Sequence, residues 1–188
     1  MDVKNVWHLW GSPGNPRQVT MISWMNIDFY DVGKEKIDMV DYIGNMIVKC
    51  TKNITGTVPT PEDEDLFADG KGDPLPKDKS SEFHTIIAKG LFKCKSVRPY
   101  IYTTVEALYT RVKNPTTDYC KNMIQMINYL NGTHKDKAIP SMDNLHVIKW
   151  YVDKYFSVCP DFKVHTGGVM TLGDESIKYL SRKKKLNT

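Results

Sequence analysis

The sequence predicts an α+β fold in which two strand-rich ends flank a helical middle. Apolar and polar residues alternate over residues 19–29, which is the period of a half-buried strand. Three later runs between residues 83 and 130 carry apolar residues at helical spacing. The residues after 146 are again rich in β-branched and aromatic types, which favour strands.

The first unit is expected to be a strand, a turn, a second strand and a helix. Residues 31–34 form the turn, and residues 35–38 return antiparallel to the first strand. The apolar positions of the first strand are Val19, Met21, Met25, Ile27 and Phe29. Those of the following helix are Met39, Ile43, Met46, Ile47 and Cys50. This unit extends over residues 19–55.

Residues 56–79 differ in composition and are predicted to be a mobile, acidic Pro/Gly linker. Four prolines remove amide donors, Gly70 and Gly72 loosen the chain, and seven of the residues are acidic. The carboxylates of residues 62–65 are consecutive. We interpret them as solvated rather than metal-binding, since neighbouring carboxylates on a flexible loop rarely converge on one ion.

Residues 80–140 are predicted to form a compact subdomain of three amphipathic helices. Ser80 and Ser81 are expected to cap the first helix, and Asp118 is expected to cap the third. Proline ends the first two helices and Asn131-Gly132 ends the last. The expected buried positions are Phe83, Ile87, Leu91, Cys94, Ile101, Val105, Leu108, Val112, Tyr119, Met123, Met126, Ile127 and Leu130. Glycine at position 90 costs about 1 kcal/mol of helix stability relative to alanine. Its presence inside a helix therefore indicates a position where another helix packs closely.

Residues 141–188 are predicted to form an antiparallel meander. The strands are residues 146–156, 167–172 and 176–180, and Gly173-Asp174 makes the hairpin between the last two.

Charge is distributed unevenly along the chain. Residues 1–79 carry 9 basic and 13 acidic residues, whereas residues 80–188 carry 17 basic and 9 acidic residues. A basic half can attract a polyanion, although the basic run of residues 182–185 is by itself more typical of a solvated tail. The four cysteines form no Cys-x-x-Cys pair, and neither a membrane span nor a secretory signal is found. The sequence therefore predicts an intracellular protein, in cytoplasm or nucleus, with reduced thiols and no membrane partner.

Several blocks resemble, in the same order, the C-terminal half of a copia-type retrotransposon Pol polyprotein. Residues 24–29, WMNIDF, resemble its YLGMxIDF strand, and residues 83–112 resemble its YRSxVGxLxYLxxxTRPDIxxAVxxLSR block. Residues 128–133 resemble RYLxGT, and Tyr151-Val152-Asp153 resembles the YxDA strand that opens its ribonuclease H domain. The resemblance extends over roughly residues 19–188 and leaves residues 1–18 as an unmatched N-terminal segment.

This resemblance implies what each unit is. Residues 19–55 are the palm-end strand pair and helix of a reverse transcriptase, and residues 80–140 are a thumb- or connection-like subdomain. Residues 141–188 are the first three strands of a truncated RNase H-like fold. The parent family is an RNA-directed DNA polymerase with RNase H, and Mg²⁺ is its cofactor.

The same resemblance implies that the chain is a catalytically inactive fragment with no cofactor of its own. It contains no Asp-Asp pair, so the polymerase metal site is missing. Asp153 matches the first RNase H carboxylate, but one carboxylate does not hold two metal ions, and Lys154 places a cation beside it. An alternative is an enzyme fragment completed by carboxylates from a partner chain.

A further alternative is a sequence-independent nucleic-acid-binding module that contacts the backbone of an RNA or DNA duplex. The candidate phosphate contacts are Lys89, Lys93, Lys95, Arg98, Lys121, Lys183, Lys184 and Lys185. Unpaired edges of the two sheets are also expected to favour self-association.

Overall fold

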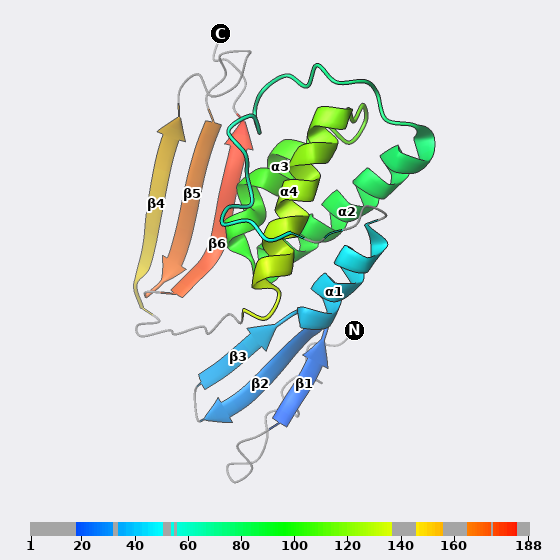
Figure 1. Cartoon of the computed structure of the whole chain (residues 1–188). Helices are drawn as coiled ribbons and strands as arrows, with labels where there is room; N and C mark the ends of the chain where they lie inside the picture. Colours follow the sequence, from blue (N-terminus) through cyan, green and yellow to red (C-terminus); the bar gives the residue numbers. More distant parts are fainter. Residues whose placement is uncertain are drawn as a thin grey trace.

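Two three-stranded antiparallel sheets lie on either side of a group of helices (Figure 1). The computed structural model describes residues 18–31, 34–50, 54, 56–136, 146–155, 165–173 and 175–183. These residues hold four α-helices and six strands in the order β1–β3, α1–α4, β4–β6. The α+β class predicted from the sequence is therefore confirmed. The expected N-terminal segment, residues 1–18, lies almost wholly outside the described residues.

The N-terminal sheet has three strands rather than the expected pair. β1 (Gln18–Ile22), β2 (Met25–Asp31) and β3 (Lys34–Asp38) pair antiparallel in that order. Ser23 and Trp24 both have positive φ angles, 50° and 67°, as a two-residue hairpin turn requires. The prediction of one continuous strand over residues 19–29 is therefore wrong.

The hairpin also divides the alternating apolar residues between two faces. Met21 pairs with Asn26 and Ile22 pairs with Met25, and directly paired residues share a face of the sheet. Met21 therefore faces the side opposite to Met25, although both are odd-numbered. The turn escapes prediction because Ser23-Trp24 lacks the glycine, asparagine or aspartate typical of such turns.

Helix α1 (Val40–Lys49) follows β3 directly and buries Ile43 and Met46, as its periodicity predicts. Asp38 joins the sheet to the helix. Its Oδ1 accepts hydrogen bonds from Asn26 Nδ2 at 3.1 Å and from the backbone nitrogen of Val40 at 3.3 Å. A carboxylate at this helix start also satisfies an otherwise unpaired amide.

Residues 56–76 pack on the helices, which differs from the expected mobile linker. Leu66 is buried in the helical core, and the Tyr119 hydroxyl accepts a hydrogen bond from the backbone nitrogen of Gly70 at 2.8 Å. Pro74 and Thr116 form an isolated β-bridge, with Leu75 N bonded to Pro115 O at 3.0 Å. Figure 1 shows this segment crossing the helices. Leu66, with Phe67 and Leu75 packed beside it, and paired amides hold a segment whose composition suggests mobility.

The helical subdomain consists of α2 (Lys77–Ser96), the 3-10 helix η3 (Pro99–Ile101), α3 (Tyr102–Tyr109) and α4 (Thr117–Thr133). Of the thirteen predicted core positions, Leu91 and Val112 are partly buried and the others are buried. The predicted helix ends are less accurate. Helix α2 begins three residues before Ser80, Asp118 makes no capping hydrogen bond, and α4 continues past Gly132. Among the described residues, no helix combines the length and apolarity that a membrane crossing requires.

The C-terminal sheet is the predicted antiparallel meander. β4 (Ile148–Tyr155), β5 (His165–Leu172) and β6 (Glu175–Lys183) lie in that order, and β6 is adjacent to α3 (Figure 1). Gly173, in the β5–β6 turn, has a φ of 61°, which a glycine adopts without strain. Asp174 of the predicted hairpin turn lies outside the described residues.

Gly90 marks a close contact between helices, as its position in the sequence predicts. A Cβ atom at residue 90 would lie 3.0 Å from Val105 Cγ2, so α2 and α3 approach too closely for a methyl group. At Gly44, in the middle of α1, an added Cβ would meet no described atom within 4 Å.

These two glycines should respond oppositely to alanine. Gly44→Ala should raise the free energy of unfolding by about 1 kcal/mol, because only the helix propensity changes. Gly90→Ala should forfeit that gain and destabilise the protein by about 1 kcal/mol, because the contact with Val105 is overpacked. Urea unfolding followed by circular dichroism measures both changes. Equal stabilisation by the two variants would contradict the close contact.

Candidate nucleic-acid interface

The basic residues predicted to contact phosphate divide into accessible and buried groups. Lys89 is half-buried and Lys95 is exposed, both on α2. Lys93, on the same helix, is 0% exposed, and Arg98 is 5% exposed. The side chain of Lys183 and the whole of Lys184 and Lys185 lie outside the described residues. Two of the predicted contacts are therefore inside the protein, where they cannot reach a phosphate backbone.

Lys89 lies beside a second lysine that sequence reasoning missed. Lys49, in the last turn of α1, lies near enough for its charge to act on Lys89. Burial and the charge of Lys49 lower the pKa of Lys89. Two ammonium groups held this close repel each other, and an anion placed between them would relieve that repulsion.

Tyr42 helps to position this lysine pair. The Lys89 ammonium lies 5.9 Å from the centroid of the Tyr42 ring, within the range of a cation–π contact. The Tyr42 hydroxyl donates a hydrogen bond of 3.4 Å to the carbonyl oxygen of Lys89, and its ring lies 5.6 Å from that of Phe92. Tyr42 and Lys49 are seven residues apart and so share one face of α1. That spacing is the signal that could have pointed to Lys49.

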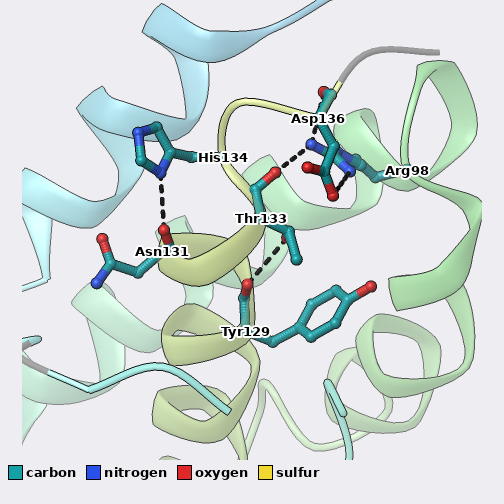
Figure 2. Close-up of polar contacts among 6 residues, drawn as sticks. All are labelled: Arg98, Tyr129, Asn131, Thr133, His134 and Asp136. Atoms are coloured by element: carbon teal, nitrogen blue, oxygen red, sulfur yellow. Dashed lines mark hydrogen bonds and ion pairs between the residues drawn. The ribbon is translucent and has the colours of Figure 1, made fainter. Parts of the chain in front are cut away.

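Arg98 is used inside the protein to hold the end of α4. Figure 2 shows its guanidinium reaching the residues that follow the helix. It donates hydrogen bonds to the carbonyl oxygen of Thr133 and, at 2.7 Å, to that of Asp136. It also contacts the Asp136 carboxylate at 3.3 Å. A cation at a helix C-terminus interacts favourably with the helix dipole, so the role of Arg98 is structural.

Lys93 is a buried cation without such partners. Its ammonium has no hydrogen-bond partner among the described residues. Burial and the nearby charge of Arg98 lower its pKa to about 7, against the opposing effect of Asp38. Lys93 lies seven residues after Ile86 and three after Gly90, on the buried stripe of α2. Its burial was therefore readable from the helical periodicity.

Lys121 lies in an acidic environment that does not favour phosphate. It forms an ion pair of 3.0 Å with Asp118, which lowers the pKa of that carboxyl. Both residues line a hollow to which Asp63, Asp65 and Asp69 also contribute. Phosphate brought to this surface would meet several carboxylates.

Lys95 belongs to a second basic cluster, where α2 and α3 meet β6. Its charge and that of Arg182 both act on Glu106, whose pKa burial raises despite a hydrogen bond from Ser181. Two cations thus converge near one half-buried carboxyl, and both are exposed at the surface. This cluster links the end of α2 to the C-terminal sheet.

Asp153 is exposed on β4. Its backbone pairs with Gly167 across the sheet, and its Oδ1 accepts a hydrogen bond of 2.8 Å from the Lys154 backbone nitrogen. No group of three or more His, Cys, Asp or Glu side chains in the described ranges could hold a metal ion. Asp153 therefore belongs to no such group in this part of the chain.

Three cysteines, Cys50, Cys94 and Cys120, are buried thiols outside any disulfide, in agreement with the predicted reduced thiols. Burial raises the pKa of Cys94 to about 12, which keeps this thiol protonated and unreactive at neutral pH. Cys159 lies outside the described residues.

The chain was compared with protein-family models, with curated proteins and with solved structures, and none of them matches it.

Lys93 should make stability depend on pH. Its pKa of about 7 in the folded state lies below its ordinary value of 10.5, so the unfolded chain binds more protons between these values. The free energy of unfolding should therefore rise as the pH increases from about 7 to about 10.

Replacement of this lysine isolates its contribution. Lys93→Met should stabilise the protein by a few kcal/mol at pH 6, and the gain should shrink towards pH 10. Lys113→Met, at an exposed position, serves as the control and should change little at either pH. Denaturant unfolding across this pH range measures the effect. A gain from Lys93→Met that does not vary with pH would contradict a depressed pKa.

Proposed function

We propose that this chain is a nucleic-acid-binding portion of a copia-type retrotransposon Pol polyprotein. The observation that carries the binding proposal is the Lys49–Lys89 pair, in which Tyr42 of α1 contacts Lys89 of α2 and the charge of Lys49 acts on Lys89. Such a pair suits a phosphate group that contacts both ammoniums. Binding to the backbone in this way does not depend on base sequence.

The order of elements supports the family assignment. A strand unit, a helix, a helical subdomain and an antiparallel meander follow one another, as the resembling sequence blocks imply. The meander carries Asp153 in the middle of its first strand, which is the place that the resemblance gives to the first RNase H carboxylate. On this proposal the C-terminal sheet derives from an RNase H-like fold.

The proposal assigns no catalytic activity to the chain itself. Two-metal chemistry needs several carboxylates converging on one point. The sequence contains no Asp-Asp pair for the polymerase site, and Asp153 belongs to no group of three or more candidate metal ligands among the described residues. The described residues therefore favour nucleic-acid binding over catalysis.

Binding should depend steeply on salt and on the lysine pair. We expect the full chain to bind a short, random-sequence RNA–DNA hybrid, with an affinity that falls as salt rises from about 50 to about 200 mM. The double substitution Lys49→Gln and Lys89→Gln should weaken binding about tenfold at low salt. It should also reduce the slope of log affinity against log salt by about 2, since two phosphate contacts are lost. Fluorescence anisotropy measures both quantities.

Lys121→Gln is the matched control, because Lys121 carries the same charge on the acidic surface. Its effect should remain below about twofold, and its slope should match that of the unmodified chain. Binding that is insensitive to salt, or equally weakened by the control, would overturn the proposal.

The chain alone should not hydrolyse RNA paired to DNA in Mg²⁺. A gel assay of a labelled hybrid tests this expectation, and Asp153→Asn is the variant to compare. Cleavage by the purified chain that disappears in Asp153→Asn would show that the remaining carboxylates are supplied after all.

A further inference from the structure

The C-terminal sheet presents one face that combines an aromatic residue with basic residues. Directly paired residues share a face. Trp150 pairs with Met170, which pairs with Lys178, and Lys154 pairs with Thr166, which pairs with Arg182. The row between them is Val152, Gly168 and Leu180. Trp150, Lys154, Lys178 and Arg182 therefore lie on the same face, which is called the tryptophan face below.

These side chains are accessible. Trp150 is 54% exposed, and the three basic residues are all exposed. Across the sheet, two strand spacings place β4 and β6 about 10 Å apart. Along β4, four residues separate Trp150 from Lys154 by about 13 Å. In the three rows from Trp150 to Lys154, every charged side chain is positive. Arg182 also acts electrostatically on Glu106 of α3, as Lys95 does.

Gly168 has no side chain, so nothing projects from the middle of this face. It is buried beneath its neighbours, and the Leu180 side chain lies 3.6 Å from the position that a Cβ of residue 168 would occupy. The apolar row is therefore shallow, with Trp150 at one corner and cations at the other three. A flat apolar surface bordered by cations suits a base and its phosphates.

We propose that the tryptophan face binds unpaired nucleotides, with a base stacked on Trp150 and phosphates contacted by Lys154, Lys178 and Arg182. Stacking on an aromatic ring accepts any base, because every base has a π face. Exposed basic groups on a sheet track the backbone that joins such bases. This inference rests on the proposed nucleic-acid binding but uses a different surface from the Lys49–Lys89 pair, and it adds single strands as a ligand.

Charge favours nucleic acid over a second copy of this chain as the occupant. A symmetric dimer through the tryptophan face would bring this positive surface against itself, because such an interface uses the same patch on both copies. Several like charges at close range oppose that arrangement. A polyanion neutralises the same groups and releases its own counterions.

Tyr151 provides a matched control for Trp150. It is the next residue on β4 and is 58% exposed, but it faces the opposite side of the sheet. Binding of the full chain to a labelled oligo(dT) of about 12 nucleotides would be measured by anisotropy. Trp150→Ala should weaken it about tenfold, Trp150→Phe should retain most of it, and Tyr151→Ala should change it less than about twofold.

An abasic oligonucleotide of the same length separates stacking from backbone contact. Trp150→Ala should have no effect on its binding, whereas joint substitution of Lys154 and Arg182 by glutamine should weaken binding of both oligonucleotides. Equal effects of Trp150→Ala and Tyr151→Ala on oligo(dT), or an equal loss on the abasic strand, would overturn the inference. So would loss of self-association in Trp150→Ala, seen by sedimentation, with oligo(dT) binding unchanged.

Failure of this inference and failure of the proposed function are distinguishable. If Trp150→Ala binds oligo(dT) normally while the Lys49 and Lys89 double variant still loses hybrid binding, only the tryptophan face is refuted. If the unmodified chain binds neither the hybrid nor oligo(dT) at low salt, both proposals are refuted.

Discussion

The arrangement of the helices depends on the buried guanidinium of Arg98. This side chain follows α2 and reaches the carbonyl groups at the end of α4, so it joins two segments 35 or more residues apart in the sequence. Because Pro99 opens η3 immediately afterwards, the same residue sets the point at which the chain turns from α2 into α3. Burying a charge is unfavourable unless its hydrogen bonds are supplied, and the end of a helix supplies them. The position of β6 beside α3 follows from this turn.

Net charge alone is therefore a poor guide to the binding surface of this protein. In the basic half, residues 80–188, the side chains of Arg98 and Lys93 are buried, and Lys121 forms an ion pair with Asp118. Two groups of accessible cations remain candidates for binding, one between α1 and α2 and one on the C-terminal sheet. The two surfaces differ in kind, since the first offers paired ammonium groups and the second adds an aromatic ring. Electrostatic attraction towards a polyanion would act through both.

The sequence predicted best what depends on local periodicity. The buried stripes of α2, α3 and α4 were readable because helical spacing brings Phe83, Val105 and Met126 into one core. The β1–β2 turn was missed because a Ser-Trp turn has no recognisable turn residue, and the packing of residues 56–76 depends on Leu66 against a distant helix. Asp153 could be placed in its strand from the sequence. The Lys49–Lys89 pair could not be predicted, since forty residues and a change of helix separate its members.

The contact between Gly90 and Val105 has an evolutionary consequence. A methyl group at position 90 would lie 3.0 Å from the Val105 side chain across the α2–α3 interface. Residues 90 and 105 therefore compete for the same space. A lineage that acquires a larger residue at position 90 should keep the fold only with a smaller residue at position 105. The two positions are thus expected to change as a pair among descendants of this chain. Positions such as Gly44, with free space around them, should vary independently.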